Sequence, residues 1–132
     1  MDSGKKDYGL ADYENELKKF GGYDIVILGT GEDCHIAALF ADYSVNNDSE
    51  YFMLLSDSPK PPKDRMTASK KLLERTNIGL IIFKGEAKRK AYKNFLNSNL
   101  SINKCPAKIV NRMEKTMVLT DLRQINDCEK IK

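Results

Sequence analysis

The feature that most constrains this chain is an aliphatic run that leads directly into a glycine-rich turn. Ile25-Val26-Ile27-Leu28 is followed by Gly29-Thr30-Gly31-Glu32-Asp33-Cys34-His35. An unbroken aliphatic run without polar alternation is typical of a strand that is buried on both faces, as in a parallel sheet. The chain is therefore expected to fold as an α/β protein, with this turn at the end of one of its strands.

The rest of the sequence alternates between helix-like and strand-like segments. Helices are predicted over 10–20, 34–40, 66–75 and 86–96, the third with Thr67 or Ser69 near its start. Strands are predicted over 23–28, 50–55, 78–83 and 115–120, whereas 106–110 fits either type. The prolines within 58–62 exclude regular structure there and predict a rigid loop. This alternation predicts an α/β fold with a mainly parallel sheet flanked by helices.

Length and composition indicate a globular protein. The chain has 132 residues, 41% of them hydrophobic and 31% charged, so residues 1–132 are expected to form one domain. The aliphatic runs are too short to cross a bilayer, and the first residues lack the apolar stretch of a signal peptide. We therefore expect no membrane partner and a cytoplasmic location.

The cysteines do not form a recognisable framework. Cys34, Cys105 and Cys128 are widely spaced and include no Cys-x-x-Cys pair. This odd count predicts neither a set of disulfides nor a structural zinc site. No metal or other cofactor is expected.

The charge is divided unequally along the chain. Residues 1–59 contain 4 Lys/Arg against 12 Asp/Glu, a net charge of −8, and residues 60–132 contain 18 against 7, a net charge of +11. A basic region of this kind can meet an anionic ligand, or it can consist of solvated helix faces that are rich in lysine. Composition alone leaves both interpretations open.

Three loops follow predicted strands, and we expect the chemistry to lie there. Parallel sheets bind their ligands in the crevice outside the carboxyl ends of the strands. The loops that meet this description are 29–33, 57–65 and 84–88.

His35 is the only histidine and lies in the first of these loops, next to two acids. Imidazole suits proton transfer near neutral pH, and a carboxylate neighbour can fix its tautomer. Gly29 and Gly31 would let the backbone turn sharply off the strand, and Glu32 and Asp33 supply the carboxylates. The alternative is a helix-capping turn with Asp33 as N-cap and a packed histidine.

Two nucleotide-binding motifs are excluded at the same turn. The dinucleotide fingerprint needs a third glycine, and Cys34 stands at that position. A phosphate-binding P-loop would need a Gly-Lys-Ser/Thr sequence, which does not follow.

Arg65 and Lys88 are the candidate anion-binding residues in the other two loops. Prolines would hold Arg65 in place at the end of the second loop, and arginine suits bidentate phosphate binding. Lys88 lies on the first turn of the predicted helix 86–96, where the helix N-terminus also attracts anions. The alternative for both is a solvated side chain on an exposed connector.

The segment 84–93 also permits a nucleic-acid interpretation, because its basic residues alternate with aromatic ones. Tyr92 and Phe95 are better explained as core residues, and no known nucleic-acid motif is present. A nucleic-acid partner is therefore the least favoured interpretation of this segment.

Taken in order, these segments resemble the sugar-phosphate lactonase and deaminase family, and within it the lactonase branch. The resemblance rests on 23–40, 57–67, 84–88 and the last predicted strand, which ends in Val118-Leu119-Thr120-Asp121. It covers nearly all of residues 13–121, and three spaced motifs in the same order make it specific.

The resemblance implies metal-free hydrolysis of a phosphorylated sugar lactone, 6-phosphogluconolactone, in the pentose phosphate pathway. By this analogy His35 is the general base that activates water, and Asp33 and Glu32 orient the imidazole or shape the turn. Arg65 and Lys88 would bind the phosphate group of the substrate. The alternative implied by the same family is a non-catalytic relative that only binds the sugar phosphate.

Several positions in the turn region depart from family patterns, Cys34 and Phe40 among them. The family has glycine where this chain has Cys34. If that position needs a positive φ or a close approach of the substrate, a side chain there costs about 1 kcal/mol or more. The related amino-sugar-phosphate deaminases have a glutamate five residues after the histidine, where this chain has Phe40. This second difference favours the lactonase branch over the deaminases.

Members of the family are about twice as long as this chain, which resembles their C-terminal half. We therefore expect a partner that completes the fold, either an N-terminal half-chain or a second copy, because half of a parallel sheet leaves an apolar surface uncovered.

Overall fold

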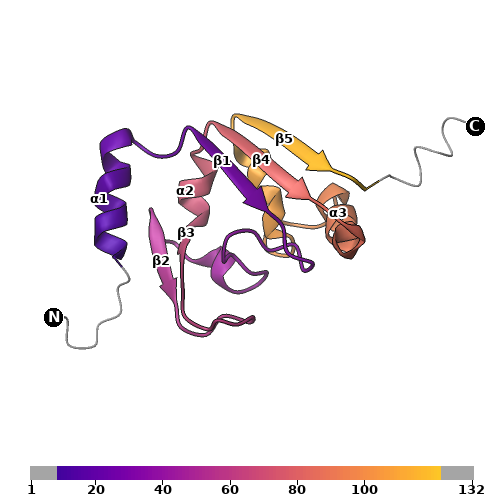
Figure 1. The fold of residues 1–132 in the computed structure, drawn as a ribbon, viewed down its shortest axis with the longest axis horizontal. Coiled ribbons are helices and arrows are strands. Elements are labelled where there is room, and N and C mark those ends of the chain that lie inside the picture. Colours follow the sequence, from indigo (N-terminus) through magenta and orange to yellow (C-terminus); the bar gives the residue numbers. More distant parts are fainter. Residues whose placement is uncertain (1–8, 123–132) are drawn as a thin grey trace, which may run out of the picture.

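The structure, a computed structural model, describes residues 9–122 (Figure 1). Its helices are α1 (Leu10–Phe20), α2 (Lys70–Glu74) and α3 (Arg89–Leu96), with 3₁₀ helices at Ser44–Asn46, Glu86–Lys88 and Pro106–Arg112. Its strands are β1 (Ile25–Gly29), β2 (Phe52–Leu55), β3 (Arg65–Ala68), β4 (Ile78–Phe83) and β5 (Lys115–Thr120). The predicted α/β class with a parallel sheet flanked by helices is confirmed.

The main sheet contains β1, β4 and β5 in the order β1-β4-β5, and both pairs are parallel. Ile27 is in register with Leu80, which is in turn in register with Met117. Because the strands are parallel, they all end at the same edge of the sheet, and Figure 1 shows their arrowheads together near α3. The loops after β1 and β4 therefore meet at this edge, as predicted. The prediction is wrong for the loop 57–65, because it follows β2, which pairs with β3 in a separate antiparallel sheet.

One face of this sheet carries the core. Leu28, Ile81 and Phe83 point into it and are buried, and the 3₁₀ helix Pro106–Arg112 covers them. Phe83 contacts the rings of Tyr92 and Phe95, both with centroids 5.1 Å away, and so attaches α3 to the end of β4. These contacts confirm that the two aromatic residues of α3 belong to the core.

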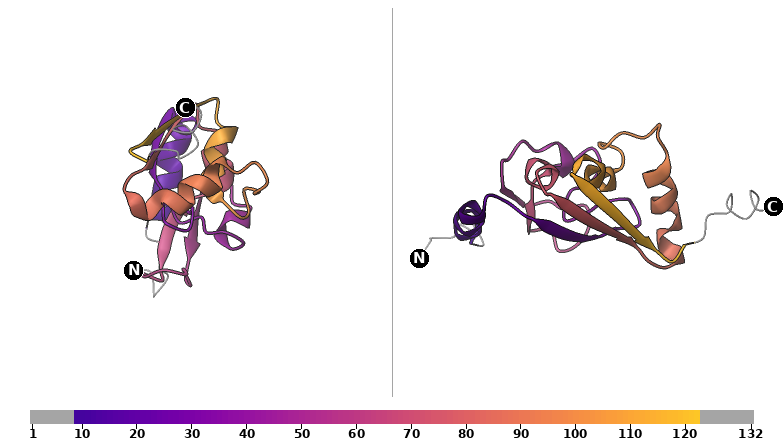
Figure 2. Two further views of the ribbon diagram at one scale, coloured as in Figure 1. Left: turned by 90° about the vertical axis from the view of Figure 1, so that its right-hand side faces the viewer. Right: turned by 90° about the horizontal axis from the view of Figure 1, so that it is seen from above.

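The opposite face of the sheet has no helix over it among residues 9–122. Figure 1 shows this face turned toward the viewer, and the view from above in Figure 2 shows α2 and α3 on the other side of the strands. Strand alternation places seven apolar side chains on this face. Ile25, Ile27, Met117 and Leu119 are each more than half exposed. We call this surface the apolar sheet face; its members are Ile25, Ile27, Ile78, Leu80, Ile82, Met117 and Leu119. A surface of this kind is typical of an interaction site.

The helix predicted over 66–75 is wrong in its first half. Residues Arg65–Ala68 form β3, which pairs antiparallel with β2, and α2 begins only after Ser69. Ser69 is the N-cap of α2, because its side chain accepts a hydrogen bond from the backbone N–H of Leu72 at 3.1 Å. Tertiary pairing with β2 thus overrides the helical pattern of this segment.

The short helix predicted over 34–40 is also wrong, because the segment forms turns. Cys34 and Ala37 have φ values of 72° and 50°, which lie in the left-handed region and cannot continue a right-handed helix. The backbone is held instead by side chains, for example by a hydrogen bond from the Ala38 N–H to Thr67 Oγ1 at 3.0 Å. The turn after β1 is therefore attached to β3, which carries the second candidate loop.

The helix predicted over 86–96 is divided into two parts. Glu86–Lys88 forms a 3₁₀ turn, and α3 begins at Arg89 with Lys88 as its N-cap residue.

No helix within residues 9–122 is long and apolar enough to span a membrane.

Candidate functional site

The turn after β1 brings Asp33 and His35 into direct contact. Asp33 Oδ1 accepts hydrogen bonds from His35 Nδ1 at 2.5 Å and from the His35 backbone N–H at 3.2 Å. Because an ionised carboxylate can only accept, the ring hydrogen lies on Nδ1. Nε2 therefore has a free lone pair and can take a proton from a bound molecule.

The charge state of Asp33 follows from its contacts. Partial burial would raise the pKa of its carboxyl, but the hydrogen bonds from His35 and the nearby Lys60 ammonium outweigh burial and lower that pKa. Lys60 Nζ lies 3.8 Å from Asp33 Oδ2. Asp33 is therefore ionised at neutral pH, as a residue that orients an imidazole must be.

Gly31 makes the contact between Asp33 and His35 possible. A Cβ atom at Gly31 would lie 2.1 Å from His35 Nδ1 and 2.8 Å from Asp33 Oδ1, closer than real atoms approach. The ring can occupy this place only because residue 31 has no side chain. At Gly29, which ends β1, a Cβ atom would meet nothing within 4 Å.

We predict that Gly31→Ala displaces the His35 ring and breaks its hydrogen bond to Asp33, whereas Gly29→Ala does not. The two glycines differ only in the space available, because neither has a positive φ. The imidazole resonances of His35, the only histidine, report on this in an NMR spectrum. Equal shifts of these resonances in the two variants would contradict the prediction.

A second prediction concerns the stability that Asp33 provides. Since its pKa is lowered on folding, its contribution is present above the ordinary aspartate pKa of about 4 and is lost as the pH falls through the lower folded value. Asp33→Asn is expected to cost up to about 1 kcal/mol at neutral pH, because the side chain is 43% exposed and screened by water.

The cost of Asp33→Asn should therefore shrink below about pH 4. Urea unfolding of both proteins between pH 3 and pH 7 measures it. Glu32→Gln removes the neighbouring exposed carboxylate and is the control, with a change below about 0.5 kcal/mol. A cost that grows on acidification would contradict the prediction.

Arg65 lies close to this pair, with the ring of Phe40 between them. The rings of His35 and Phe40 have centroids 4.6 Å apart, and Arg65 Cζ lies 5.7 Å from the Phe40 centroid. The Arg65 guanidinium also donates to three carbonyl oxygens of the proline-rich loop, those of Lys60 (3.3 Å), Pro61 (2.8 Å) and Pro62 (3.1 Å). These bonds use Nε and Nη2, so Nη1 has no hydrogen-bond partner within residues 9–122 and remains able to bind an anion.

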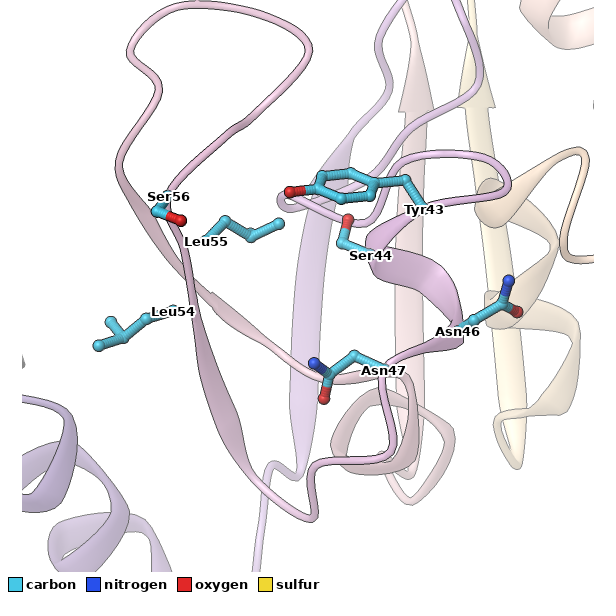
Figure 3. A pocket seen from close by; sticks show the side chains of 7 residues that line it. All are labelled: Tyr43, Ser44, Asn46, Asn47, Leu54, Leu55 and Ser56. Atoms are coloured by element: carbon cyan, nitrogen blue, oxygen red, sulfur yellow. The ribbon is translucent and has the colours of Figure 1, made fainter.

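Space for a ligand lies beside Arg65. An open pocket of about 440 Å³ lies beside the turn segment after β1, β3 and the proline-rich loop. It is lined by Ala37, Ala38, Pro62, Asp64, Arg65, Met66, Thr67 and Ala68. A second pocket, of about 360 Å³, lies between the segment 43–47 and the end of β2 (Figure 3). No charged side chain lines the second pocket, so the first is the better candidate for an anionic ligand.

The other predicted site residues lie around this centre without direct contact to His35. Glu32 is exposed on the turn, and Lys88 is half-buried on the 3₁₀ turn beyond β4. Lys88 is at the same edge of the sheet because β4 is parallel to β1. Arg89, one residue further, is paired with Glu86 through bonds of 2.6 and 2.7 Å.

Lys60 and Phe40 are site residues that sequence reasoning did not select. Lys60 stands between prolines in the second loop, so its restricted backbone was a usable signal. The contact of Phe40 with His35 was not visible in the sequence, because it depends on the turns that replace the predicted helix 34–40.

The parallel sheet and the acid–imidazole pair at its carboxyl edge define an α/β protein whose candidate site lies where such sheets bind ligands. A family model described as Glucosamine-6-phosphate isomerases/6-phosphogluconolactonase matches residues 1–119. The chain belongs to this family, as its motifs suggested.

Individual relatives agree with this assignment. The 6-phosphogluconolactonase of Borreliella burgdorferi is 36% identical over 117 residues, which cover 87% of this chain and 50% of the relative. The human 6-phosphogluconolactonase is 33% identical over 106 residues, covering 75% of this chain and 41% of the relative. The crystal structure of the Thermotoga maritima 6-phosphogluconolactonase superposes with a TM-score of 0.74 at 25% identity, over 89% of this chain and 52% of that one. The chain thus spans about half the length of the curated relatives it matches.

Proposed function

We propose that this chain carries the general-base centre of a 6-phosphogluconolactonase and takes part in the hydrolysis of 6-phosphogluconolactone. The observation that carries this proposal is the 2.5 Å contact between Asp33 and His35 at the carboxyl edge of a parallel sheet. The names of the relatives supply the substrate class.

In the proposed reaction His35 Nε2 takes a proton from a water molecule as the water oxygen attacks the lactone carbonyl carbon. Asp33 keeps the ring in the required tautomer and stabilises the imidazolium that forms. The tetrahedral intermediate then collapses, the bond between the carbonyl carbon and the ring oxygen breaks, and His35 returns the proton to that oxygen. The product is 6-phosphogluconate, and no metal is required.

The proposed phosphate contacts are Arg65 and Lys88, joined by Lys60. Arg65 has its Nη1 hydrogens available beside the 440 Å³ pocket, and the proline-rich loop holds its other donors. Lys60 lies next to Asp33, and Lys88 stands on the neighbouring strand-end loop. Arginine and lysine side chains suit a doubly charged phosphate.

Phe40 supports the lactonase branch over the deaminases. It stands where the resemblance implies a glutamate in the deaminases, and its ring packs against the His35 ring. An apolar ring at this point supplies no second carboxylate to the imidazole.

The cytoplasmic location and a role for Glu32 stay predictions.

We further propose that the N-terminal half of a lactonase covers the apolar sheet face. Its seven aliphatic and thioether side chains form a continuous surface across three strands, with Ile27, Leu80 and Met117 in one row. Complete burial of such side chains is worth up to about 1.5–3 kcal/mol each, which favours association of the two chain segments. This chain, combined with the N-terminal half of the Borreliella burgdorferi relative, is called the assembled enzyme below.

The test of function measures lactone hydrolysis above the spontaneous rate, for this chain alone and for the assembled enzyme. Hydrolysis by the assembled enzyme that saturates with substrate is the expected result. Binding of 6-phosphogluconate without hydrolysis would instead establish a non-catalytic sugar-phosphate-binding relative. If the assembled enzyme shows no hydrolysis and no binding, both forms of the proposal are refuted.

The apolar sheet face makes a separate prediction. Ile27→Lys should prevent assembly, whereas Lys19→Glu, on the exposed surface of α1, should not. Because Ile27 is 65% exposed, its replacement is expected to change the stability of this chain by less than about 0.5 kcal/mol. Light scattering measures the association. We expect the wild-type chain to assemble with the N-terminal half or to self-associate, and we expect Ile27→Lys to do neither. A wild-type chain that stays monomeric with the N-terminal half present would contradict it.

A further inference from the structure

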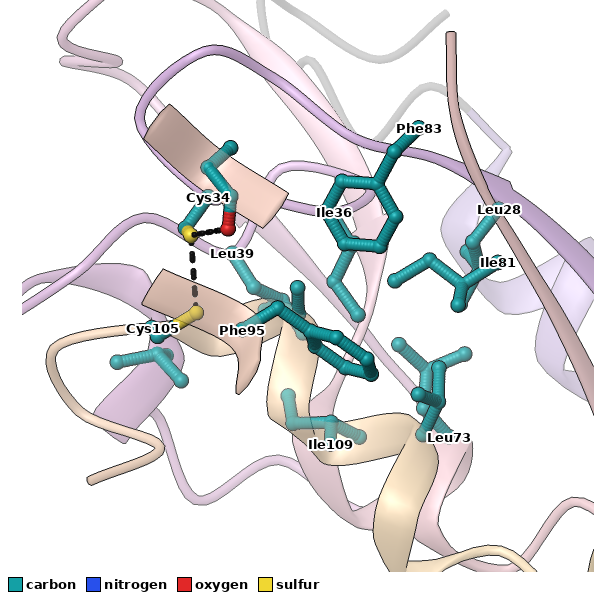
Figure 4. Packing of buried hydrophobic residues seen from close by; sticks show 14 of the residues in the cluster. Leu28, Cys34, Ile36, Leu39, Leu73, Ile81, Phe83, Phe95, Cys105 and Ile109 are labelled. Atoms are coloured by element: carbon teal, nitrogen blue, oxygen red, sulfur yellow. Dashed lines mark hydrogen bonds between the residues drawn. The ribbon is translucent and has the colours of Figure 1, made fainter. Parts of the chain in front are cut away.

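Cys34, which stands between Asp33 and His35 in the turn, has its sulfur in contact with the sulfur of Cys105. Cys34 and Cys105 are 71 residues apart in sequence and both buried, and their Sγ atoms are 2.9 Å apart (Figure 4). Both are free thiols. The resemblance implies glycine at the position of Cys34, so this pair distinguishes the chain from the family pattern.

The backbone already holds the two cysteine segments together. The N–H of Ala107, two residues after Cys105, donates to the carbonyl oxygen of Cys34 at 3.0 Å. The Cys34 thiol also donates to the carbonyl oxygen of Ala91 on α3 at 3.2 Å. A covalent bond between the sulfurs would need them to approach by only about 0.9 Å, to the usual disulfide length of about 2.0 Å.

We propose that Cys34 and Cys105 form an oxidation site, at which a peroxide converts the two thiols to an intramolecular disulfide. The bond would attach the turn that carries Asp33 and His35 to the 3₁₀ helix Pro106–Arg112. This inference does not depend on lactone hydrolysis, because it rests on the contact between the two thiols.

The reaction balances with hydrogen peroxide as the oxidant. The Cys105 sulfur, as its thiolate, attacks one peroxide oxygen and the O–O bond breaks, giving a sulfenic acid and a hydroxide that takes up a proton to become water. The Cys34 sulfur then attacks the Cys105 sulfur, the S–O bond breaks, and the released hydroxide takes the Cys34 proton as a second water. Two thiols are oxidised and one peroxide is reduced.

The surroundings favour Cys105 as the first nucleophile. The hydrogen bond shared with Cys34 and the charge of Lys108 lower the pKa of the Cys105 thiol, although its burial opposes this. The same hydrogen bond together with burial raises the pKa of the Cys34 thiol. Because both sulfurs are buried, a water-sized oxidant is the suitable one, and bulky disulfides are expected to react poorly.

The bond should stabilise the fold. It would close a loop of about 70 residues, which restricts the unfolded chain strongly. A rise in melting temperature of about 10 °C is expected for the oxidised protein.

The experiment uses the full chain with Cys128→Ser, so that only the proposed pair is left. After treatment with hydrogen peroxide, intact mass should fall by two hydrogens, and peptide mapping should join the peptides that contain residues 34 and 105. Dithiothreitol should restore the mass and the lower melting temperature. The same treatment of Cys34→Ala and Cys34→Gly variants in this background should give no cross-link and no rise in melting temperature. The glycine variant also removes the side chain from a residue with a positive φ.

Three results would overturn the proposal. The first is addition of oxygen without a cross-link, and the second is a disulfide between two chains. The third is an intact mass that peroxide leaves unchanged.

Discussion

Replacing His35 with alanine is expected to lower the rate of lactone hydrolysis by the assembled enzyme by about 100- to 10,000-fold. His35 Nδ1 lies 2.5 Å from Asp33 Oδ1, which leaves Nε2 as the proton acceptor. His35 is the only histidine of the chain, so no other imidazole can replace it. Without it, the attacking water has no positioned base. Steady-state hydrolysis of 6-phosphogluconolactone measures the effect.

His35→Asn makes this prediction sharper. An asparagine amide can still donate a hydrogen bond to Asp33 from about the position of Nδ1, but it supplies no base. The loss of activity should therefore be as large as in His35→Ala, although the turn is better preserved. Lys19→Ala, on the exposed surface of α1, is the control and should keep wild-type activity. Activity retained in His35→Asn would assign His35 a structural role only.

Phe83→Ala is expected to destabilise the chain by about 3–5 kcal/mol, the largest effect on stability predicted here. Phe83 has no exposed surface and packs against Tyr92 and Phe95 at 5.1 Å. Its removal would leave a cavity between the end of β4 and α3, close to the loop that carries Lys88. Domains of this size are typically stable by only 5–15 kcal/mol, so the loss is a large fraction of the total.

Phe20→Ala provides the matched control, because it makes the same chemical change at a position that is 77% exposed. It should alter stability by less than about 0.5 kcal/mol. Urea unfolding followed by circular dichroism compares the two variants. Equal shifts of their midpoints would contradict the core described for this fold.

The sequence predicted the parallel sheet because its strands are the most strongly patterned segments. β1 and β4 are aliphatic runs, and β5 coincides with the segment predicted as the last strand. The same turn motif led to Asp33 and His35, whose separation by one residue allows a contact formed largely within the turn. These features depend on local pattern, which a sequence displays directly.

Other features depend on contacts between distant residues, and the sequence did not display them. The helix predicted over residues 34–40 does not form, because Cys34 and Ala37 have positive φ values and the Ala38 N–H bonds to Thr67 instead of to a helix carbonyl. β3 exists because it pairs with β2. Lys60 reaches Asp33 only because the proline-rich loop folds back over the turn.

The most direct test of the central claim is rescue of His35→Ala by imidazole in solution. Alanine leaves the space of the ring open, so added imidazole can act as the missing base beside Asp33. We predict that the hydrolysis rate of the His35→Ala assembled enzyme rises with imidazole concentration and saturates, whereas the wild type shows only the background increase. A wild-type rate in His35→Ala before imidazole is added, or equal responses of the two proteins to imidazole, would contradict the role of His35 as the general base.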